Sequence, residues 1–126
     1  MMAEALIPYL AVKDAHAALD FYQRAFGVEV ASRFVGQDGK LGFADLRLGQ
    51  ARWFLGDEYP DLGVGAPGPL AAVTLVLALP DPLSLYERAA AAGMEVVTPL
   101  EPQEDGARRA RLRDPYGHRW ILSTSG

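Results

Sequence analysis

The chain has 126 residues and no cysteine, and its 16 acidic and 12 basic residues give a formal net charge of −4 at pH 7. Half of the residues are hydrophobic and 22% are charged, which is the composition of an ordinary globular domain. The lack of cysteine excludes a disulfide framework, a cysteine-based zinc site and a thiol nucleophile. The negative charge disfavours nucleic acid as a partner, because non-specific binding depends on the neutralisation of phosphates by Lys and Arg.

The N-terminal segment does not have the features of a secretory signal. It contains Glu4, and no basic start precedes a long apolar run. No stretch of the sequence approaches the length of a transmembrane helix. We therefore expect a cytoplasmic protein with no membrane partner.

The first half of the chain predicts one helix and four strands. Asp14 is a favourable N-cap, apolar residues then recur every three or four positions, and Gly27 supplies a C-terminal stop. A helix is therefore expected over 14–26. Strands are expected, from their length and alternation, over 6–12, 28–35, 43–48 and 51–55.

The second half repeats this order after a connector rich in Gly, Pro and Asp. Asp81 and Pro82 predict the start of a helix and Gly93 its end. Asp81 follows Asp14 by 67 positions, and Gly93 follows Gly27 by 66, so the two halves are duplicated. Strands are expected over 71–79, 94–100, 108–113 and 119–123, the last two joined by a type I turn.

The duplication predicts a single α+β domain over 1–126, made of two tandem βαβββ modules. Module one is expected over about 6–56, the connector over about 57–69, and module two over about 70–124. Each sheet has a mostly polar face opposite a face suited to a helix. We therefore expect a cup-shaped mixed sheet around a shared cleft, with the helices outside.

Four stretches of sequence carry a resemblance to a known superfamily. VKD at 12–14, DFY at 20–22 and AFG at 25–27 resemble the opening of glyoxalase and bleomycin-resistance proteins, and DPYGHRW at 114–120 resembles their final hairpin. The resemblance covers nearly the whole chain and implies the vicinal oxygen chelate fold, which ring-cleaving dioxygenases acting on dihydroxybiphenyl share. Members of this superfamily usually pair, so it also implies a homodimer.

The same resemblance implies that the superfamily's metal site is missing. Metal-dependent members hold a divalent ion with His, Gln or Glu side chains from four cup-facing strand positions. These positions match Ile7, Phe54, Thr74 and Ile121 here. None of the four is a usual metal ligand, so we expect neither a metal nor another cofactor.

The sequence indicates no catalytic residue. The only two histidines are His16, expected on the first helix, and His118, expected at the last turn, where it packs or forms a local hydrogen bond. There is no GxSxG elbow, glycine-rich phosphate loop or nucleophile beside an evident base. Trp53 and Trp120 alternate to the helix-packed faces, where they suit the core or a dimer contact.

Arginines gather near the C-terminus. Arg109, Arg111 and Arg113 alternate with Ala110 and Leu112, so all three are expected to project from the open face of their strand. Guanidinium groups make paired hydrogen bonds to carboxylate or phosphate, which indicates an anion site. The alternative is a solvated face whose arginines pair with acidic side chains. The candidate partners are Asp45, Glu101, Glu104 and Asp105.

Aromatic residues on the open strand faces suit a flat or amphiphilic organic ligand, although core packing explains them as well. The candidate ligand-binding residues are Tyr9, Phe43, Asp45, Arg47, Arg52, Phe54, Arg109, Arg111 and Arg113. We favour a metal-free protein that sequesters a small drug or metabolite, as bleomycin-resistance members do, with an anionic or amphiphilic ligand. The alternative is a glyoxalase-like lyase or isomerase, or a ring-cleaving dioxygenase, which would use a divalent metal.

Overall fold

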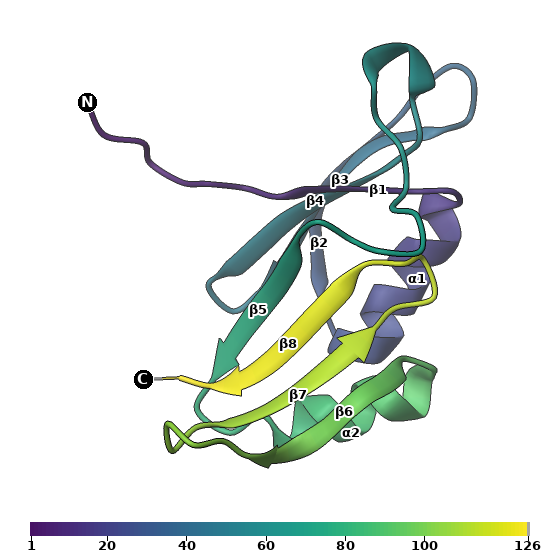
Figure 1. Cartoon of the computed structure of the whole chain (residues 1–126). Coiled ribbons are helices and arrows are strands. Elements are labelled where there is room, and N and C mark those ends of the chain that lie inside the picture. The colour runs from purple at the N-terminus through teal and green to yellow at the C-terminus, as the bar shows by residue number, and fades with distance from the viewer. Residues whose placement is uncertain (126) are drawn as a thin grey trace.

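A computed structural model of the chain describes residues 1–125, and these contain two helices and eight strands (Figure 1). Helix α1 (Ala15–Phe26) follows the first strand and helix α2 (Leu83–Ala92) follows the fifth. The strands are β1 (Tyr9–Val12), β2 (Glu29–Val35), β3 (Leu41–Leu48), β4 (Ala51–Asp57), β5 (Thr74–Leu79), β6 (Glu95–Pro102), β7 (Arg108–Arg113) and β8 (Arg119–Thr124). A short 3-10 helix, η1 (Pro60–Leu62), lies in the connector. Among the described residues, neither α1 nor α2 is long and apolar enough to cross a membrane.

The strands form two four-stranded mixed sheets, in the orders β1-β4-β3-β2 and β5-β8-β7-β6. In each sheet the first strand pairs in parallel with the last strand of its module, and the other pairs are antiparallel. The expected α+β class with two βαβββ modules is confirmed.

Helix α1 begins and ends where its sequence predicts. The Asp14 carboxylate accepts a hydrogen bond from the N–H of Ala17 at 3.1 Å, which satisfies one of the unpaired donors of the first turn. Gly27 ends the helix in the left-handed region, at a φ of 72°, which a side chain would disfavour.

Helix α2 begins later than its sequence predicts. Its first residue is Leu83, and Pro82 rather than Asp81 stands at the N-cap. The Asp81 carboxylate still accepts a hydrogen bond from the N–H of Leu83 at 3.0 Å. Gly93 ends the helix as expected.

Strand β1 is shorter than the predicted strand 6–12. Its backbone pairing with β4 begins near the hydrogen bond from the Phe54 N–H to the Pro8 carbonyl, at 2.7 Å. The preceding residues run away from the body of the protein (Figure 1), and Leu6 is 95% exposed. Residues 1–8 are therefore called the arm below.

The core lies between the two sheets and is built on aromatic side chains from both modules. Trp53 of β4 and Trp120 of β8 face each other with 5.1 Å between ring centroids, and Phe26 of α1 is 5.1 Å from Trp120. Tyr22, one turn earlier, packs edge-on against both tryptophans. All four side chains are almost fully buried, so Trp53 and Trp120 are core residues.

Helix α2 lies beside α1. The Arg88 guanidinium of α2 donates hydrogen bonds to the carbonyls of Arg24 and Gln23, at 2.8 and 3.1 Å, and so satisfies the C-terminal carbonyls of α1. Tyr22 and Phe26 of α1 also pack against both Trp53 and Trp120, so the helices cover the apolar sides of the two sheets and leave the mostly polar sides open.

A buried carboxylate joins the modules. Asp114, which is 2% exposed, lies in the turn between β7 and β8 and accepts hydrogen bonds from the Tyr22 hydroxyl and from Trp120 Nε1, the latter at 2.9 Å. It also accepts the N–H groups of Tyr116 and His118, at 2.9 and 3.0 Å. Burial, and then the charge of Asp114, raise the pKa of Tyr22 well above its usual value.

Asp114→Ala is expected to lower the free energy of unfolding by about 3–5 kcal/mol, because it leaves four donors without an acceptor in a buried place. Urea unfolding measures the loss. The control is Asp81→Ala, which removes an exposed carboxylate and is expected to cost under about 1 kcal/mol. Similar losses in both variants would show that Asp114 does not hold the modules together.

Candidate functional site

Each sheet has an open face, turned away from the helices, that carries the candidate ligand-binding residues. In the first sheet Asp45 lies opposite Phe54, and Arg47 lies opposite Arg52. We call this surface the first open face. Its candidate residues are Tyr9, Phe43, Asp45, Arg47, Arg52 and Phe54.

Asp45 is the acidic residue to which both arginines of the first open face bind. It is 5% exposed, and its two carboxylate oxygens accept hydrogen bonds from Arg52 Nε and Nη2, both at 3.1 Å. Arg47 Nη2 reaches the same carboxylate at 3.0 Å. The hydrogen bonds from Arg52 and then Arg47 lower the pKa of Asp45 to about 2. Two guanidiniums on one carboxylate leave one net positive charge, and this charge is partly solvated because the side chains of Arg47 and Arg52 remain 47% and 36% exposed.

Aromatic rings lie beside this cluster. The rings of Phe43 and Phe54 are 5.5 Å apart, and the Arg52 guanidinium stands 5.3 Å from the Phe54 ring centroid. Tyr9 is 40% exposed, and its hydroxyl donates a hydrogen bond to the Gly42 carbonyl at 2.5 Å. The first open face thus offers apolar ring surface next to a partly solvated cation, which can hold a flat molecule with a negative group.

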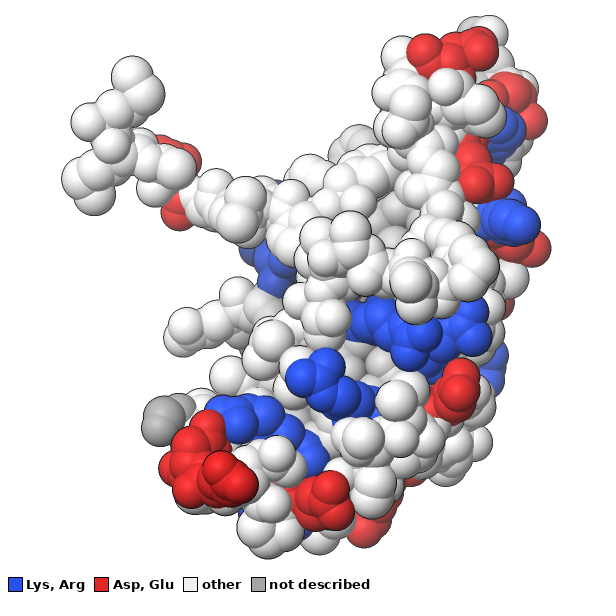
Figure 2. All heavy atoms as spheres, in the orientation of Figure 1, with Lys and Arg blue, Asp and Glu red and all other residues white. Residues whose placement is uncertain are grey.

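The second sheet presents arginines on its own open face. Ala110 and Leu112 are buried, so the predicted register of β7 is confirmed. Figure 2 shows Lys and Arg side chains gathered over this sheet, on the face that it turns toward the viewer in Figure 1. We call this surface the second open face.

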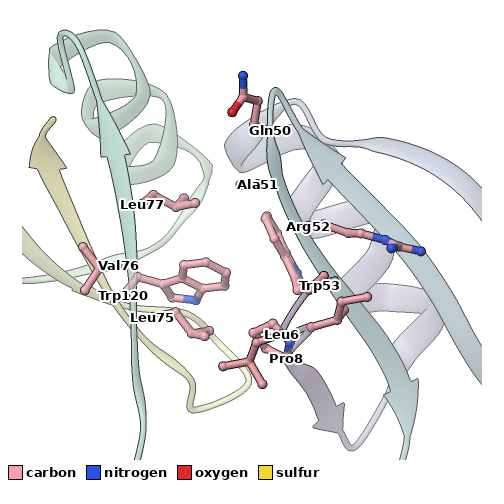
Figure 3. A pocket seen from close by; sticks show the side chains of 12 residues that line it. Leu6, Pro8, Gln50, Ala51, Arg52, Trp53, Leu75, Val76, Leu77 and Trp120 are labelled. Carbon is pink, nitrogen blue, oxygen red and sulfur yellow. The ribbon is translucent and has the colours of Figure 1, made fainter. Parts of the chain in front are cut away.

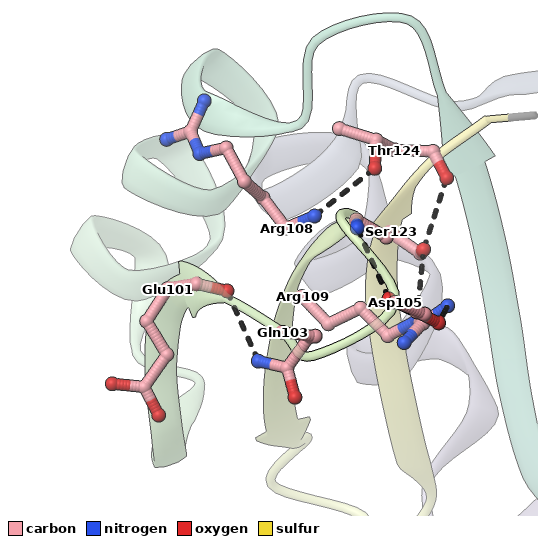
Figure 4. A network of polar contacts seen from close by, with 8 residues as sticks. Glu101, Gln103, Asp105, Arg108, Arg109, Ser123 and Thr124 are labelled. Atoms are coloured by element: carbon pink, nitrogen blue, oxygen red, sulfur yellow. Dashed lines mark hydrogen bonds and ion pairs between the residues drawn. The ribbon is translucent and has the colours of Figure 1, made fainter.

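Two of the three predicted arginines of this face are bound to acidic side chains. Arg109 Nη2 donates to Asp105 at 2.7 Å and its Nε donates to Ser123 at 3.1 Å (Figure 4). Arg113 lies 3.7 Å from Glu95. These two contacts match the solvated-face alternative, with Asp105 as one of the partners named from the sequence.

The third, Arg111, has no carboxylate within 4 Å among residues 1–125, and the same holds for Arg119 of β8. Sequence reasoning did not single out Arg119 as a binding residue. The sequence could have predicted that Arg119 lies on this face, because it stands opposite Arg113 across the last turn.

The two open faces point away from each other within one chain. A cavity of about 370 Å³ separates β4 and the arm from β5. In Figure 3, Trp53 and Trp120 lie on its two sides, whereas Arg52 and Val76 point outward in opposite directions. The structure therefore brings the six candidates of the first sheet together, and the three arginines of β7 together, but it does not place the two sets in one cleft.

The positions that match the superfamily's metal ligands do not fit a divalent ion. Ile7, Phe54 and Ile121 carry no donor atom, and Thr74 offers only a neutral hydroxyl. Within residues 1–125, no three His, Cys, Asp or Glu side chains lie close enough to share a metal.

The histidines are bound to backbone carbonyls. His118 Nε2 lies 2.9 Å from the carbonyl of Ala11. The side chain of His118 therefore connects the last turn to β1, instead of bonding only within the turn. His16 Nε2 lies 3.0 Å from the carbonyl of Gly39.

Comparison of the sequence with known families and proteins gives one family and two relatives. The model of the Glyoxalase/Bleomycin resistance protein/Dioxygenase superfamily matches residues 4–122. An uncharacterised protein of Mycobacterium bovis is 41% identical over 123 residues, which covers 94% of this chain and 81% of that protein. An uncharacterised protein of Mycobacterium tuberculosis has the same identity, with 72% of its length covered.

Solved structures share the fold. TioX from Micromonospora sp. ML1 has a TM-score of 0.79 and 25% identity, over 97% of this chain and 98% of that one. The fosfomycin resistance protein FosX from Listeria monocytogenes, complexed with Mn(II) and sulfate, has a TM-score of 0.76, over 100% of this chain and 95% of that one. At 15% identity, the likeness to FosX shows the fold alone.

Asp45→Asn is expected to remove an acid-sensitive contribution to stability. The native pKa of Asp45 is depressed from 3.8 to about 2, so its contribution is fully present above about pH 4 and is lost as the pH falls toward 2. Because the arginines are partly exposed, we expect about 1 kcal/mol at neutral pH. Urea unfolding at neutral pH and at about pH 3 measures it.

The control for this experiment is Asp20→Asn, an exposed change on α1. The difference between wild type and Asp45→Asn should shrink at the lower pH, whereas the control difference should stay constant. A difference for Asp45→Asn that does not change with pH would contradict the depressed pKa.

Proposed function

Because the chain belongs to the Glyoxalase/Bleomycin resistance protein/Dioxygenase superfamily, we propose that it binds and sequesters a small organic molecule without the help of a metal. A shared fold does not by itself decide function, so the proposal depends on the residues of the open faces. One observation carries it: the ring pair of Phe43 and Phe54 lies beside two arginines held on the buried Asp45.

This arrangement supports a flat or amphiphilic ligand with a negative group. The rings give apolar contact area, and the guanidinium N–H groups that Asp45 does not use remain available to an anion. Asp45 fixes the direction of both arginines, so little side-chain freedom is lost when a ligand binds.

The ligand's cleft is proposed to form between two copies of the chain. Each open face is one wall, and the two walls of one chain diverge, so a second wall has to come from a partner. Two-fold pairing of the first open face of one protomer with the second open face of the other makes two identical clefts. The free edges of β1 and β5, at which no strand among residues 1–125 pairs, support this pairing.

A sequestering role follows better from these residues than a lyase, isomerase or dioxygenase role. Each of those reactions in this superfamily would use a divalent ion, and the four matching positions do not fit one. Binding alone needs only a cleft. We also propose that the protein acts in the cytoplasm.

The ligand-binding proposal is tested by thermal shift with a panel of aromatic carboxylates and phosphates, with and without a chelator. A ligand that binds only the native state raises the melting temperature. We expect a rise that the chelator does not change and that Phe54→Ala reduces, since Phe54 forms part of the ring surface. The matched control is Leu83→Ala, an exposed apolar change on α2. A shift that disappears with the chelator, or that is equal in both variants, would contradict the proposal.

The pairing proposal predicts a particle of twice the chain mass of 13.6 kDa at micromolar concentration. Light scattering coupled to size exclusion measures the mass. Leu6→Asp, in the exposed arm, is expected to weaken the pair, because a charge replaces an apolar side chain that is 95% exposed in one chain. A constant monomer mass at all concentrations would contradict the proposal that the cleft forms between two protomers.

A further inference from the structure

A small hollow lies on the second open face, where β5, β7 and β8 meet the end of the connector. Its volume is about 230 Å³. Its lining combines a hydroxyl and two guanidiniums with apolar side chains, from Leu70, Ala71, Thr74, Val97, Arg111 and Arg119. The two arginines lie on the central strands β8 and β7, and the apolar residues lie beyond them, Leu70 and Ala71 beside β5 and Val97 on β6.

The positive charge of this hollow is not neutralised by the chain. Three arginines of β7 lie near a carboxylate: Arg108 is 3.9 Å from Asp81, and Arg109 and Arg113 are bound as described above. Arg111 and Arg119 have no carboxylate within 4 Å among residues 1–125. A chain of net charge −4 thus leaves two arginines of its second sheet, on neighbouring strands, without a carboxylate partner among residues 1–125.

The strand register directs both guanidiniums to the same place. Arg111 lies opposite Ile121 and Arg119 opposite Arg113, so Arg111 and Arg119 are diagonal neighbours, about 7–8 Å apart at the backbone. Long side chains reach across this distance. Thr74 lies beside Arg119 in the parallel pair of β5 and β8, so its hydroxyl is on the same face.

We infer that Thr74, Arg111 and Arg119 form an oxyanion subsite, which holds a carboxylate or phosphate group of the ligand. The inference rests on the proposed function and adds where the negative group is bound. Two forked guanidiniums can each donate paired hydrogen bonds to one oxyanion, and the hydroxyl supplies a further donor. The apolar residues at the two ends of the hollow, Leu70 and Val97, accommodate the carbon atoms that carry the group.

Backbone NMR of the full chain tests the subsite with three probes of similar size. Phenyl phosphate and benzoate carry the oxyanion, and benzyl alcohol is neutral. We expect saturable shifts of the amide signals of Thr74, Arg111 and Arg119 with at least one anionic probe. In Arg111→Met and in Arg119→Met the affinity for that probe should fall about tenfold or more, because one charged hydrogen-bond pair is lost.

The matched control is Arg108→Met, on the same strand but on its other face. It removes the same charge and should leave the affinity within about twofold, whereas benzyl alcohol should bind all four proteins equally. Equal weakening in Arg108→Met, or equal affinity in all four proteins, would overturn the subsite. If the probes still shift Phe43 and Phe54 in that case, the proposed function stands; if no probe shifts any signal, both are overturned.

Discussion

The carboxylate of Asp114 and the aromatic core around it hold the two modules in one arrangement. The carboxylate belongs to the second module, and one of its donors, Tyr22, belongs to the first. A charge buried in this way is stable only when its hydrogen bonds are satisfied, so the last turn has to stay against α1. This contact, together with the aromatic core, keeps the same face of each sheet covered.

The covered faces are those of Trp53 and Trp120, and the open faces are therefore directed outward. This geometry gives each chain two open faces of different chemistry. The first open face is aromatic, with arginines fixed on an acidic side chain. The second is rich in arginine, and part of its charge is balanced by Asp105 and Glu95. The FosX structure, which has the same fold, holds Mn(II), whereas the open faces here carry aromatic rings and arginines.

Much of the fold was predictable because its signals are local. The helix limits follow from Asp14, Gly27 and Gly93, whose backbone preferences act within a few residues. The burial of Ala110 and Leu112 follows from alternation along one strand. The superfamily was recognisable because its motifs lie at both ends of the duplicated unit.

The relation between the modules was not predictable, because the same apolar faces are buried whether the helices lie outside a cup or between the sheets. Sequence pattern fixes which side of a strand is apolar, not what covers it. For the same reason it did not decide which arginines are neutralised. Asp105 lies in the tight turn just before β7, so Arg109 at the start of the strand can bind it. Arg111 is two residues further along the same face and has no acidic turn residue beside it.

The contact between Tyr22 and Asp114 also has a consequence during synthesis. The two residues are 92 positions apart, and Trp120, the other side-chain donor to Asp114, lies six positions further along the chain. At about 5–20 residues per second, the first module leaves the ribosome several seconds before its aromatic face can be covered. The first module cannot cover this face until the β7–β8 hairpin has been made, so the two modules complete their folding together rather than in succession.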